Sequence, residues 1–216
     1  MQKLRKLLKL SIYKTLVFNL KYFGRMGLTF PVLVSRNMRL NKCNGKVILN
    51  SYRFANITLG FGDVSIFDSK IEKGIWDNNG EVYFGKSVSL GHGTRISNKG
   101  KLNIGDDFTI TANSSLICYQ NINIGCDCYI SWECLVMDTD IHKLCDQSGK
   151  VINYDKPVFI GNHVWMGCRC TVLKGSKISD DTVVASCSVI NKEFDENYIL
   201  IGGSNKVLKT NINWKV

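Results

Sequence analysis

One segment of the chain combines a histidine with two carboxylates at close spacing. Asp138, Asp140 and His142 alternate along the run D-T-D-I-H. An imidazole beside a carboxylate is typical of a general base, because the acidic neighbour holds the ring in one tautomer. The chemistry that this pattern favours is removal of a proton from a substrate. Which aspartate orients His142 stays open.

The segment around His142, residues 137–157, interrupts a six-residue repeat of aliphatic side chains. The repeat runs through Ile160, Met166, Val172, Ile178, Val184 and Ile190. An amphipathic helix repeats near 3.6 residues and a strand at 2, whereas a six-residue period indicates a parallel β-helix of stacked coils. Upstream, two-residue slips separate three blocks with the same period: Phe84, Leu90, Ile96, Leu102; Ile104, Ile110, Leu116, Ile122; and Ile124, Ile130, Val136. We therefore expect an all-β fold of about five or six coils, from which residues 137–157 leave as an excursion.

A second periodic feature accompanies the first. Four places after most ladder residues stands a small or β-branched side chain, with Phe108 as the exception: Val88, Thr94, Ser114, Cys128, Cys134, Val164, Cys170, Ser176, Thr182 and Ser188. In a triangular coil the aliphatic residue fills the middle of a face, and the small one fits a tight corner. A glycine directly follows several ladder residues, where the backbone must turn or pack closely: Gly85, Gly91, Gly105, Gly125, Gly161 and Gly167.

Charge divides the chain into parts. With 44% hydrophobic and 21% charged residues, its 216 residues are typical of one soluble domain with an appendage. The net charge is +10, but residues 1–46 hold eleven Lys and Arg and no Asp or Glu, so the remainder is nearly neutral. We expect a basic N-terminal helix and connector at 1–45, the β-helix at 46–196 and a C-terminal tail at 197–216.

The basic N-terminal segment predicts an amphipathic α-helix over residues 2–23. Its apolar stripe has i, i+4 spacing: Leu4, Leu8, Ile12, Leu16 and Leu20. The interpretation we favour is packing on the β-helix or a neighbouring subunit; contact with an anionic membrane surface in addition is the alternative. Within this predicted helix the longest uncharged run, residues 15–20, is too short for a membrane span or a signal peptide. We expect a cytoplasmic protein, at most peripheral at the inner face of the plasma membrane, and the segment has no nucleic-acid reader motif.

Nine cysteines are an odd and high number. Cys128, Cys134 and Cys170 stand in the small-residue slot, where a thiol acts as a small hydrophobe. The cysteine pairs at 126/128 and 168/170 lack the usual spacing of zinc pairs, so we expect reduced structural thiols and no metal. His92 and His163 should lie on outward parts of their coils. The three histidines do not supply the close pair that a β-helical zinc carbonic anhydrase needs.

Two motifs and the ladder between them resemble a known enzyme family. The runs D-T-D-I-H at 138–142 and K-P-V-F-I-G-N-H-V-W-M-G at 156–167 are similar to motifs of the hexapeptide-repeat acetyltransferases. The resemblance covers about residues 82–210 and is greatest to the maltose and galactoside O-acetyltransferase branch, with its relatives that acetylate capsular and lipopolysaccharide sugars. It implies a left-handed parallel β-helix, a homotrimer, and acetyl-CoA in grooves between subunits.

The resemblance also implies roles for individual residues. His142 matches the base that takes the proton from a sugar hydroxyl. Trp165 matches a tryptophan near the pantetheine or the acetyl group. The small residues that match backbone contacts to pantetheine are Gly167, Cys168, Ala185, Ser186 and Ser188. Lys192 and Lys206 match basic residues near the phosphates of acetyl-CoA. Trp132 and Glu133 could line the acceptor pocket or could simply be surface residues. The implied function is O-acetylation of a bacterial surface polysaccharide or its sugar precursor.

The sequence departs from the family pattern at two places. His142 is followed by Lys143 and Leu144, where the family often has proline, and residues 202–206 read G-G-S-N-K without the usual proline. N-acetylation of an amino sugar nucleotide and a non-catalytic β-helix scaffold remain alternatives. Serine O-acetylation is disfavoured because the helical domain of those enzymes is missing.

Overall fold

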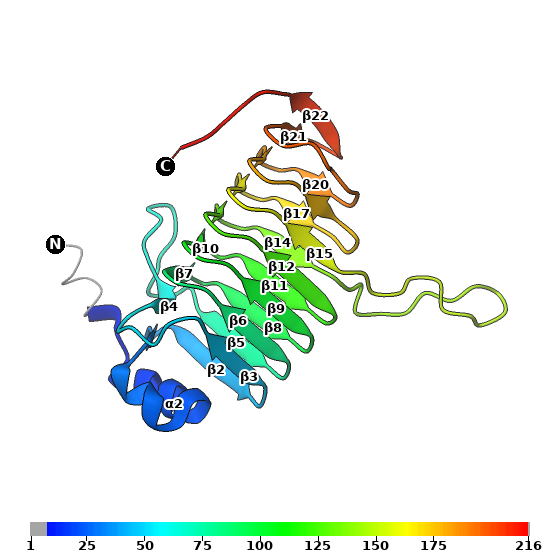
Figure 1. Cartoon of the computed structure of the whole chain (residues 1–216). Helices are drawn as coiled ribbons and strands as arrows, with labels where there is room; N and C mark the ends of the chain where they lie inside the picture. The colour runs from blue at the N-terminus through cyan, green and yellow to red at the C-terminus, as the bar shows by residue number, and fades with distance from the viewer. Residues whose placement is uncertain (1–7, 216) are drawn as a thin grey trace.

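The structure, a computed structural model, describes residues 8–215, and its body is a triangular prism of stacked coils (Figure 1). Successive strands run around three parallel sheets, which we name faces A, B and C. Face A comprises β1 (Val32–Val34), β4 (Ile57–Phe61), β7 (Val88–His92), β10 (Thr109–Ala112), β13 (Tyr129–Ile130), β16 (Trp165–Met166), β19 (Val183–Val184) and β21 (Leu200–Gly202), with β22 (Lys206–Lys209) added antiparallel.

The other two faces follow the same order. Face B comprises β2 (Met38–Cys43), β5 (Gly74–Asn78), β8 (Arg95–Asn98), β11 (Ser115–Cys118), β14 (Leu135–Met137), β17 (Thr171–Val172) and β20 (Val189–Ile190). Face C comprises β3 (Lys46–Leu49), β6 (Glu81–Phe84), β9 (Lys101–Ile104), β12 (Asn121–Ile124), β15 (Val158–Ile160) and β18 (Lys177–Ile178). The prism therefore has three corners, AB, BC and CA, where the chain passes from one face to the next.

Strand register explains both the six-residue period and its slips. On face C, β9 turns two side chains inward, Leu102 and Ile104, and β12 does the same with Ile122 and Ile124. Because alternate residues of a strand point inward, each extra inward residue lengthens its coil by two residues and produces a two-residue slip in the period. Strand β18 has only one inward residue, Ile178, so the period that begins at Ile160 runs through it without a slip.

The core confirms the two predicted side-chain series. Every ladder residue from Phe84 to Ile190 is buried, and so is every residue of the small-residue slot, Phe108 included. The glycines that follow ladder residues allow close approach of coils: a Cβ on Gly105 would lie 2.6 Å from the carbonyl carbon of Gly125. These glycines do not have positive φ angles, so their role is packing rather than turning.

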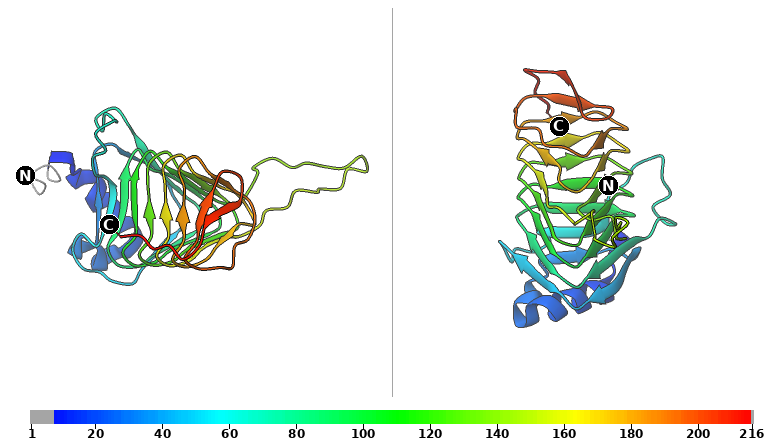
Figure 2. Two further views of the ribbon diagram at one scale, coloured as in Figure 1. Left: turned by 90° about the horizontal axis from the view of Figure 1, so that it is seen from above. Right: turned by 90° about the vertical axis from the view of Figure 1, so that its right-hand side faces the viewer.

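Helix α2 (Ile12–Phe23) lies across the N-terminal end of the prism (Figures 1 and 2), but the predicted side does not face inward. It buries Thr15, Phe18 and Asn19, and leaves Leu16 and Leu20 of the leucine stripe exposed. The helix begins after Ser11, whose hydroxyl accepts from the Lys14 amide, so the prediction of one helix over 2–23 was wrong at Ser11; Leu4 lies outside the described residues. Within residues 8–215, no helix is long and apolar enough to cross a membrane.

The reason for this orientation is the free edge of β1. Asn19 Nδ2 donates to the carbonyl oxygen of Val32 at 2.6 Å, and the Val32 amide donates back to Asn19 Oδ1 at 3.2 Å. The Val34 amide donates to Thr15 Oγ1 at 3.0 Å. An edge strand exposes unpaired backbone groups, and polar helix side chains satisfy them here. The need for hydrogen bonds, rather than for apolar contact, selects the inner face of α2.

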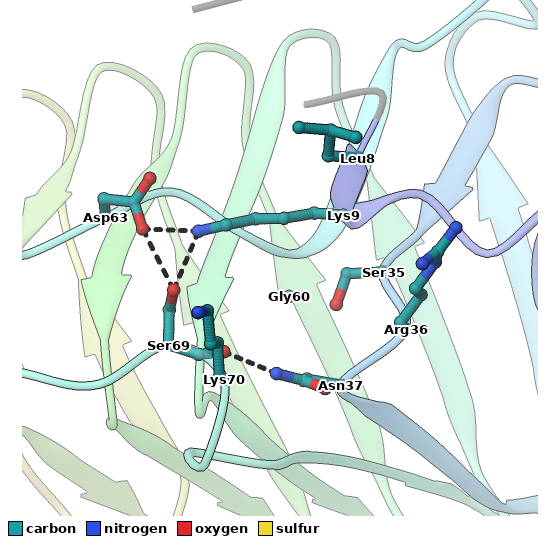
Figure 3. Close-up of a pocket in the computed structure, with 9 residues that line it drawn as sticks. All are labelled: Leu8, Lys9, Ser35, Arg36, Asn37, Gly60, Asp63, Ser69 and Lys70. Atoms are coloured by element: carbon teal, nitrogen blue, oxygen red, sulfur yellow. Dashed lines mark hydrogen bonds and ion pairs between the residues drawn. The ribbon is translucent and has the colours of Figure 1, made fainter. Parts of the chain in front are cut away.

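The coil stack begins earlier than predicted. Residues 24–45, expected as a connector, contain the 3₁₀ helix η1 (Gly24–Thr29) and the first two strands, so the prism starts at Val32. A loop at residues 62–73 leaves corner AB between β4 and β5. Lys9 holds this loop in place, because its ammonium donates to Gly62 O at 2.9 Å. Figure 3 shows its other two contacts, a hydrogen bond to Ser69 Oγ at 3.0 Å and an ion pair with Asp63.

A second, longer excursion leaves corner BC between β14 and β15. We call residues 138–157 the arm; it extends away from the prism (Figure 2) and agrees with the predicted excursion at 137–157. Its two limbs pair at an antiparallel bridge between Cys145 and Val151. Residues 140–150 are all exposed, so the arm rests on its own chain only at its root.

Candidate active site

His142 lies near the root of the arm, directly after a strained turn. Its amide donates to the carbonyl oxygen of Asp140 at 2.6 Å, which closes a three-residue turn around Ile141 with φ of 65°. Thr139 Oγ1 accepts from the Ile141 amide at 2.9 Å. A β-branched residue rarely has a positive φ, and such strain gathers at functional sites. The turn therefore supports a functional role for the residue that it presents.

The two aspartates before His142 form no hydrogen bond with its ring. Asp138 is fully buried, and its carboxylate accepts from the amides of Tyr119, Gln120 and Asn121 at 2.7 to 2.8 Å. No residue between 8 and 215 hydrogen-bonds the His142 imidazole. Asp138 thus fixes the neighbouring coil instead of orienting the histidine, a role that a buried carboxylate fulfils through backbone donors.

Asp140 fixes the root of the arm. Its Oδ2 accepts from Asn153 Nδ2 at 2.7 Å and from Lys174 Nζ at 2.5 Å. The hydrogen bond from Lys174 lowers the pKa of the Asp140 carboxyl from its ordinary value. Asn153 also donates to His142 O at 2.9 Å and accepts from the Leu144 amide at 2.6 Å, so it ties the limbs together on both sides of the histidine. Sequence reasoning missed Asn153 and Lys174, which no motif marks.

Corner AB holds the small residues expected to bind acetyl-CoA. A Cβ on Gly167 would lie 2.6 Å from the amide nitrogen of Ser186, so the two coils approach here too closely for any larger residue. The amides of Cys168 and Ser186 donate to no residue in the described part of the chain, whereas Gly167 and Ala185 donate along the sheet. Ser188 is buried, and its hydroxyl bonds Ala185 O at 2.6 Å, so only its backbone faces the corner.

Trp165 stands on the outer side of face A, 38% exposed, with its Nε1 donating to Ser131 Oγ at 3.4 Å. The C-terminal tail returns to this place. Trp214 stacks on His163 with ring centroids 4.5 Å apart and lies 6.2 Å from the ring of Trp165. His163 is partly exposed at corner CA, as expected, and its Nδ1 lies 2.9 Å from Asp181 Oδ1. Trp214 had no signal in the sequence, because only the fold brings the tail back.

The two predicted phosphate-binding lysines lie at the C-terminal end of the prism. Lys192 follows β20, with its ammonium 5.0 Å from the centre of the Phe194 ring. Lys206 is exposed in β22. Their neighbours Asn191 and Asn205 form two hydrogen bonds, of 3.0 and 2.6 Å, which bring the segments that carry both lysines together.

Trp132 lines a cleft of about 460 Å³ between the loop 62–73 and the outer side of face A. The other lining residues mix aromatic and polar groups: Phe61, Gly62, Asp63, Val64, Ser65, Ser89, Thr109, Ile110, Thr111 and Tyr129. The Thr111 hydroxyl is buried and has no partner among residues 8–215. Glu133 turns elsewhere and pairs with Arg169 at 2.7 Å. Sequence reasoning missed Asp63, Thr111 and Tyr129, because the loop that encloses the cleft has no periodic pattern.

His92 is the one histidine whose expected position was wrong. It is 1% exposed at the end of β7, with Phe67 of the loop 62–73 against its ring at 6.1 Å between centroids. The loop covers what would be an outward position, and burial lowers the pKa of His92. A separate cavity of about 520 Å³ at the other side of this loop (Figure 3) contains no predicted site residue.

The predicted site residues do not meet within one chain. The arm leaves corner BC, whereas Gly167 and Ser186 lie at corner AB and Trp165 on face A. All nine cysteines are free thiols. Among residues 8–215, no cluster of His, Cys, Asp or Glu has the composition to hold a metal ion.

Comparisons with known proteins agree on one kind of enzyme. No family model matches the chain. The polysialic acid O-acetyltransferase of Escherichia coli O1:K1 is 30% identical over 125 residues, which cover 56% of this chain and 41% of the relative. The galactoside O-acetyltransferase of Escherichia coli K12 is 24% identical over 128 residues, 59% of this chain and 57% of the relative. The chain thus spans about half the length of these two curated relatives.

A solved structure extends the similarity over most of the chain. The crystal structure of the polysialic acid O-acetyltransferase OatWY is 28% identical, with a TM-score of 0.53, and the match covers 86% of this chain and 87% of that one. The match covers most of both chains, so the two proteins share the fold of stacked coils.

Proposed function

Because the chain belongs to the hexapeptide-repeat acetyltransferases, whose fold is a left-handed parallel β-helix, we propose that it transfers an acetyl group from acetyl-CoA to a sugar hydroxyl. The proposed acceptor is a bacterial surface polysaccharide or its sugar precursor, in line with the acceptors named for the similar proteins. The observation that carries the proposal is the position of His142 after a strained turn on an arm that leaves its own prism.

The proposed enzyme is a homotrimer with its active sites between subunits. Within one chain the arm and corner AB are at different corners of the prism, so His142 needs a second chain to meet an acetyl-CoA site. The arm carries exposed apolar side chains that suit burial against such a neighbour: Ile141, Leu144, Ile152 and Tyr154. Three prisms around a threefold axis would close three identical sites.

In the proposed mechanism, His142 acts as the general base in a direct transfer. A hydroxyl is a weak nucleophile at neutral pH, so a positioned base contributes roughly 10²- to 10⁴-fold. The imidazole accepts the hydroxyl proton as the oxygen bonds to the thioester carbonyl carbon. The carbon–sulfur bond then breaks, and the imidazolium returns the proton to the departing sulfur. The amides of Cys168 and Ser186, which have no acceptor among residues 8–215, would donate to the developing oxyanion.

The acetyl-CoA groove is proposed along corner AB. The pantetheine chain would run beside Gly167 and Ser186, with Trp165 against its acetyl end. Lys192 and Lys206, at the C-terminal end of the prism, would face the phosphates. Acetyl-CoA is a cytoplasmic metabolite, so we propose a cytoplasmic enzyme.

The acceptor is proposed to enter the cleft at Trp132. Aromatic rings of Trp132 and Tyr129 offer flat faces for a pyranose, and Asp63 and the unpartnered Thr111 hydroxyl offer groups for its hydroxyls. Tyr129 is directly beside Trp165 in the strand register of face A. The cleft thus lies beside the proposed acetyl position.

The test is acetyl transfer by the purified chain from acetyl-CoA to capsular polysaccharides. CoA release is followed by chromatography, because the exposed thiols of Cys145 and Cys187 would react with a thiol reagent. His142→Ala should lower turnover roughly 10²- to 10⁴-fold, and Lys143→Ala, next to it on the arm, should leave it unchanged. Wild-type turnover in His142→Ala would refute the base. A wild-type chain that binds no acetyl-CoA would instead indicate a scaffold, and a product acetylated on nitrogen would exclude O-acetylation.

A further inference from the structure

The outer face of α2 is apolar and has no partner among the described residues. Five side chains on this face are 37% to 78% exposed: Ile12, Tyr13, Leu16, Val17 and Leu20. Met26 and Leu28 in η1 continue the apolar surface and are more than half exposed. Contiguous exposed apolar side chains of this kind mark an interaction surface.

The charged residues of the segment that carries this face all have one sign. Lys21 and Arg25 are exposed beside the apolar residues, and residues 1–46 contain no Asp or Glu. A helix with an apolar face flanked only by cations is the form that lies in the plane of an anionic membrane surface. Two copies of this face would bring cation against cation, which disfavours a second copy of the chain as its occupant.

A basic groove adjoins the apolar face. It has a volume of about 500 Å³, and two of its lining residues, Tyr13 and Val17, belong to the apolar face itself. The charged residues of its lining are all cations: Lys14, Arg36, Arg39 and Lys73. Burial and the nearby charge of Lys73 lower the pKa of Lys14. An anion in the groove would relieve the repulsion between these cations.

The groove has a fixed shape. Lys14 Nζ donates to the carbonyl oxygens of Arg36 and Met38 at 2.6 and 2.8 Å, which leaves one of its three donors free. This geometry places a cation next to the exposed ring of Tyr13 and the side chain of Val17. A phosphate whose hydrocarbon tail continues over α2 would satisfy both the groove and the apolar face.

We propose that the chain docks on an anionic phospholipid membrane through α2. The outer face of the helix lies at the acyl boundary, and the groove between Lys14 and Lys73 takes a lipid phosphate. Because α2 crosses the N-terminal end of the prism (Figure 2), the prism stands on the membrane by that end and the arm points along the surface. The inference needs no catalytic activity and stands apart from the proposed acetyl transfer.

The experiment is flotation of the full chain with vesicles of phosphatidylcholine alone or mixed with phosphatidylglycerol. We expect binding to the mixed vesicles and not to the neutral ones, with loss at high salt. The variant I12Q/L16Q should lower the partition coefficient at least tenfold, and R39Q/K73Q about fivefold for each cation removed. The control is I66Q/I71Q, which changes two isoleucines in the loop 62–73 that are 64% and 73% exposed and should bind as wild type.

Three outcomes would overturn the proposal. They are absence of flotation, equal binding to neutral vesicles, and wild-type binding by I12Q/L16Q with its melting temperature unchanged. Inorganic phosphate tests whether the groove binds a free phosphate instead of the phosphate of a lipid. If millimolar phosphate binds the free chain and R39Q/K73Q abolishes that binding while flotation persists in both variants, the groove takes free phosphate and not lipid.

Discussion

Lys174 forms an ion pair with Asp140, its Nζ 2.5 Å from Asp140 Oδ2, and so joins the root of the arm to the coil that follows it. The same ammonium donates to the carbonyl oxygens of Asn153 and Tyr154 at 2.9 and 3.2 Å. The three bonds together hold both limbs of the arm. The bond to Asp140 lies two residues before His142. The carboxylate that the D-T-D-I-H motif offers to the histidine is therefore bonded to a lysine 34 residues away.

Replacement of Lys174 should impair catalysis without unfolding the protein. Lys174→Met removes all three bonds of the ammonium, so the arm and His142 lose their fixed position. We expect kcat to fall about 10- to 100-fold with little change in the KM for acetyl-CoA. The matched control is Lys177→Met, which breaks a similar ion pair, to Asp195 at 2.6 Å, and whose ammonium forms no hydrogen bond with the arm. Lys174→Arg should recover part of the rate.

A double variant shows whether Lys174 acts through the histidine. If its only catalytic effect is to position His142, then His142→Ala with Lys174→Met should be no slower than His142→Ala alone. Additive losses in kcat would mean that Lys174 acts separately, and the positioning role would have to be abandoned.

The two tryptophans of face A and corner AB should separate the two substrates. Trp165→Ala removes a ring proposed to contact acetyl-CoA, and Trp132→Ala removes one proposed to contact the acceptor. A buried aromatic contact is worth roughly 1.5–3 kcal/mol, so we expect each KM to rise about ten- to a hundredfold, for acetyl-CoA in the first and for the glycan in the second. Steady-state kinetics with each substrate varied in turn gives both values. If Trp165→Ala instead raised the KM for the glycan and Trp132→Ala raised the KM for acetyl-CoA, the two proposed roles would be reversed.

The sequence predicted the body of the fold because one period governs it. The ladder and the small-residue slot are buried, and the excursion at 137–157 is the arm. The sequence did not show which side of α2 faces inward, because the stripe at Leu16 and Leu20 is a pattern of hydrophobicity, whereas the free edge of β1 requires hydrogen bonds. It also could not show the true partners of Asp138 and Asp140, since three backbone amides and Lys174 reach them only through coil stacking.

Stability measurements should distinguish the two faces of α2. Asn19→Ala leaves the backbone groups of Val32 without partners in a buried place, so we expect a loss of about 1–3 kcal/mol in unfolding free energy. For a chain of this length, that is a fall of about 2–4 °C in Tm per kcal/mol. Leu20→Ala on the outer face should change the free energy by less than about 0.5 kcal/mol. A larger effect for Leu20 than for Asn19 would contradict the observed orientation.

The cysteines should divide into reactive and inert classes. Cys145 and Cys187 are exposed, whereas Cys118 and Cys128 are buried in the core. Burial raises the pKa of Cys118, and it raises the pKa of Cys128 to about 12. The thiolate is the reactive form, so alkylation at about pH 8 should modify Cys145 and Cys187 within minutes and leave the buried pair intact until the chain unfolds.

The raised pKa of Cys128 also has a consequence for stability. Because the ordinary pKa of 9.0 lies below that of the folded chain, the unfolded chain loses the proton first as the pH rises. The thiol therefore stabilises the fold fully below pH 9.0 and loses this contribution between 9.0 and about 12. Cys128→Ala should show a smaller fall in Tm over this range than wild type, while Cys145→Ala should follow wild type. Peptide mass mapping after alkylation checks the same assignment, and early labelling of Cys128 in folded protein would refute its burial.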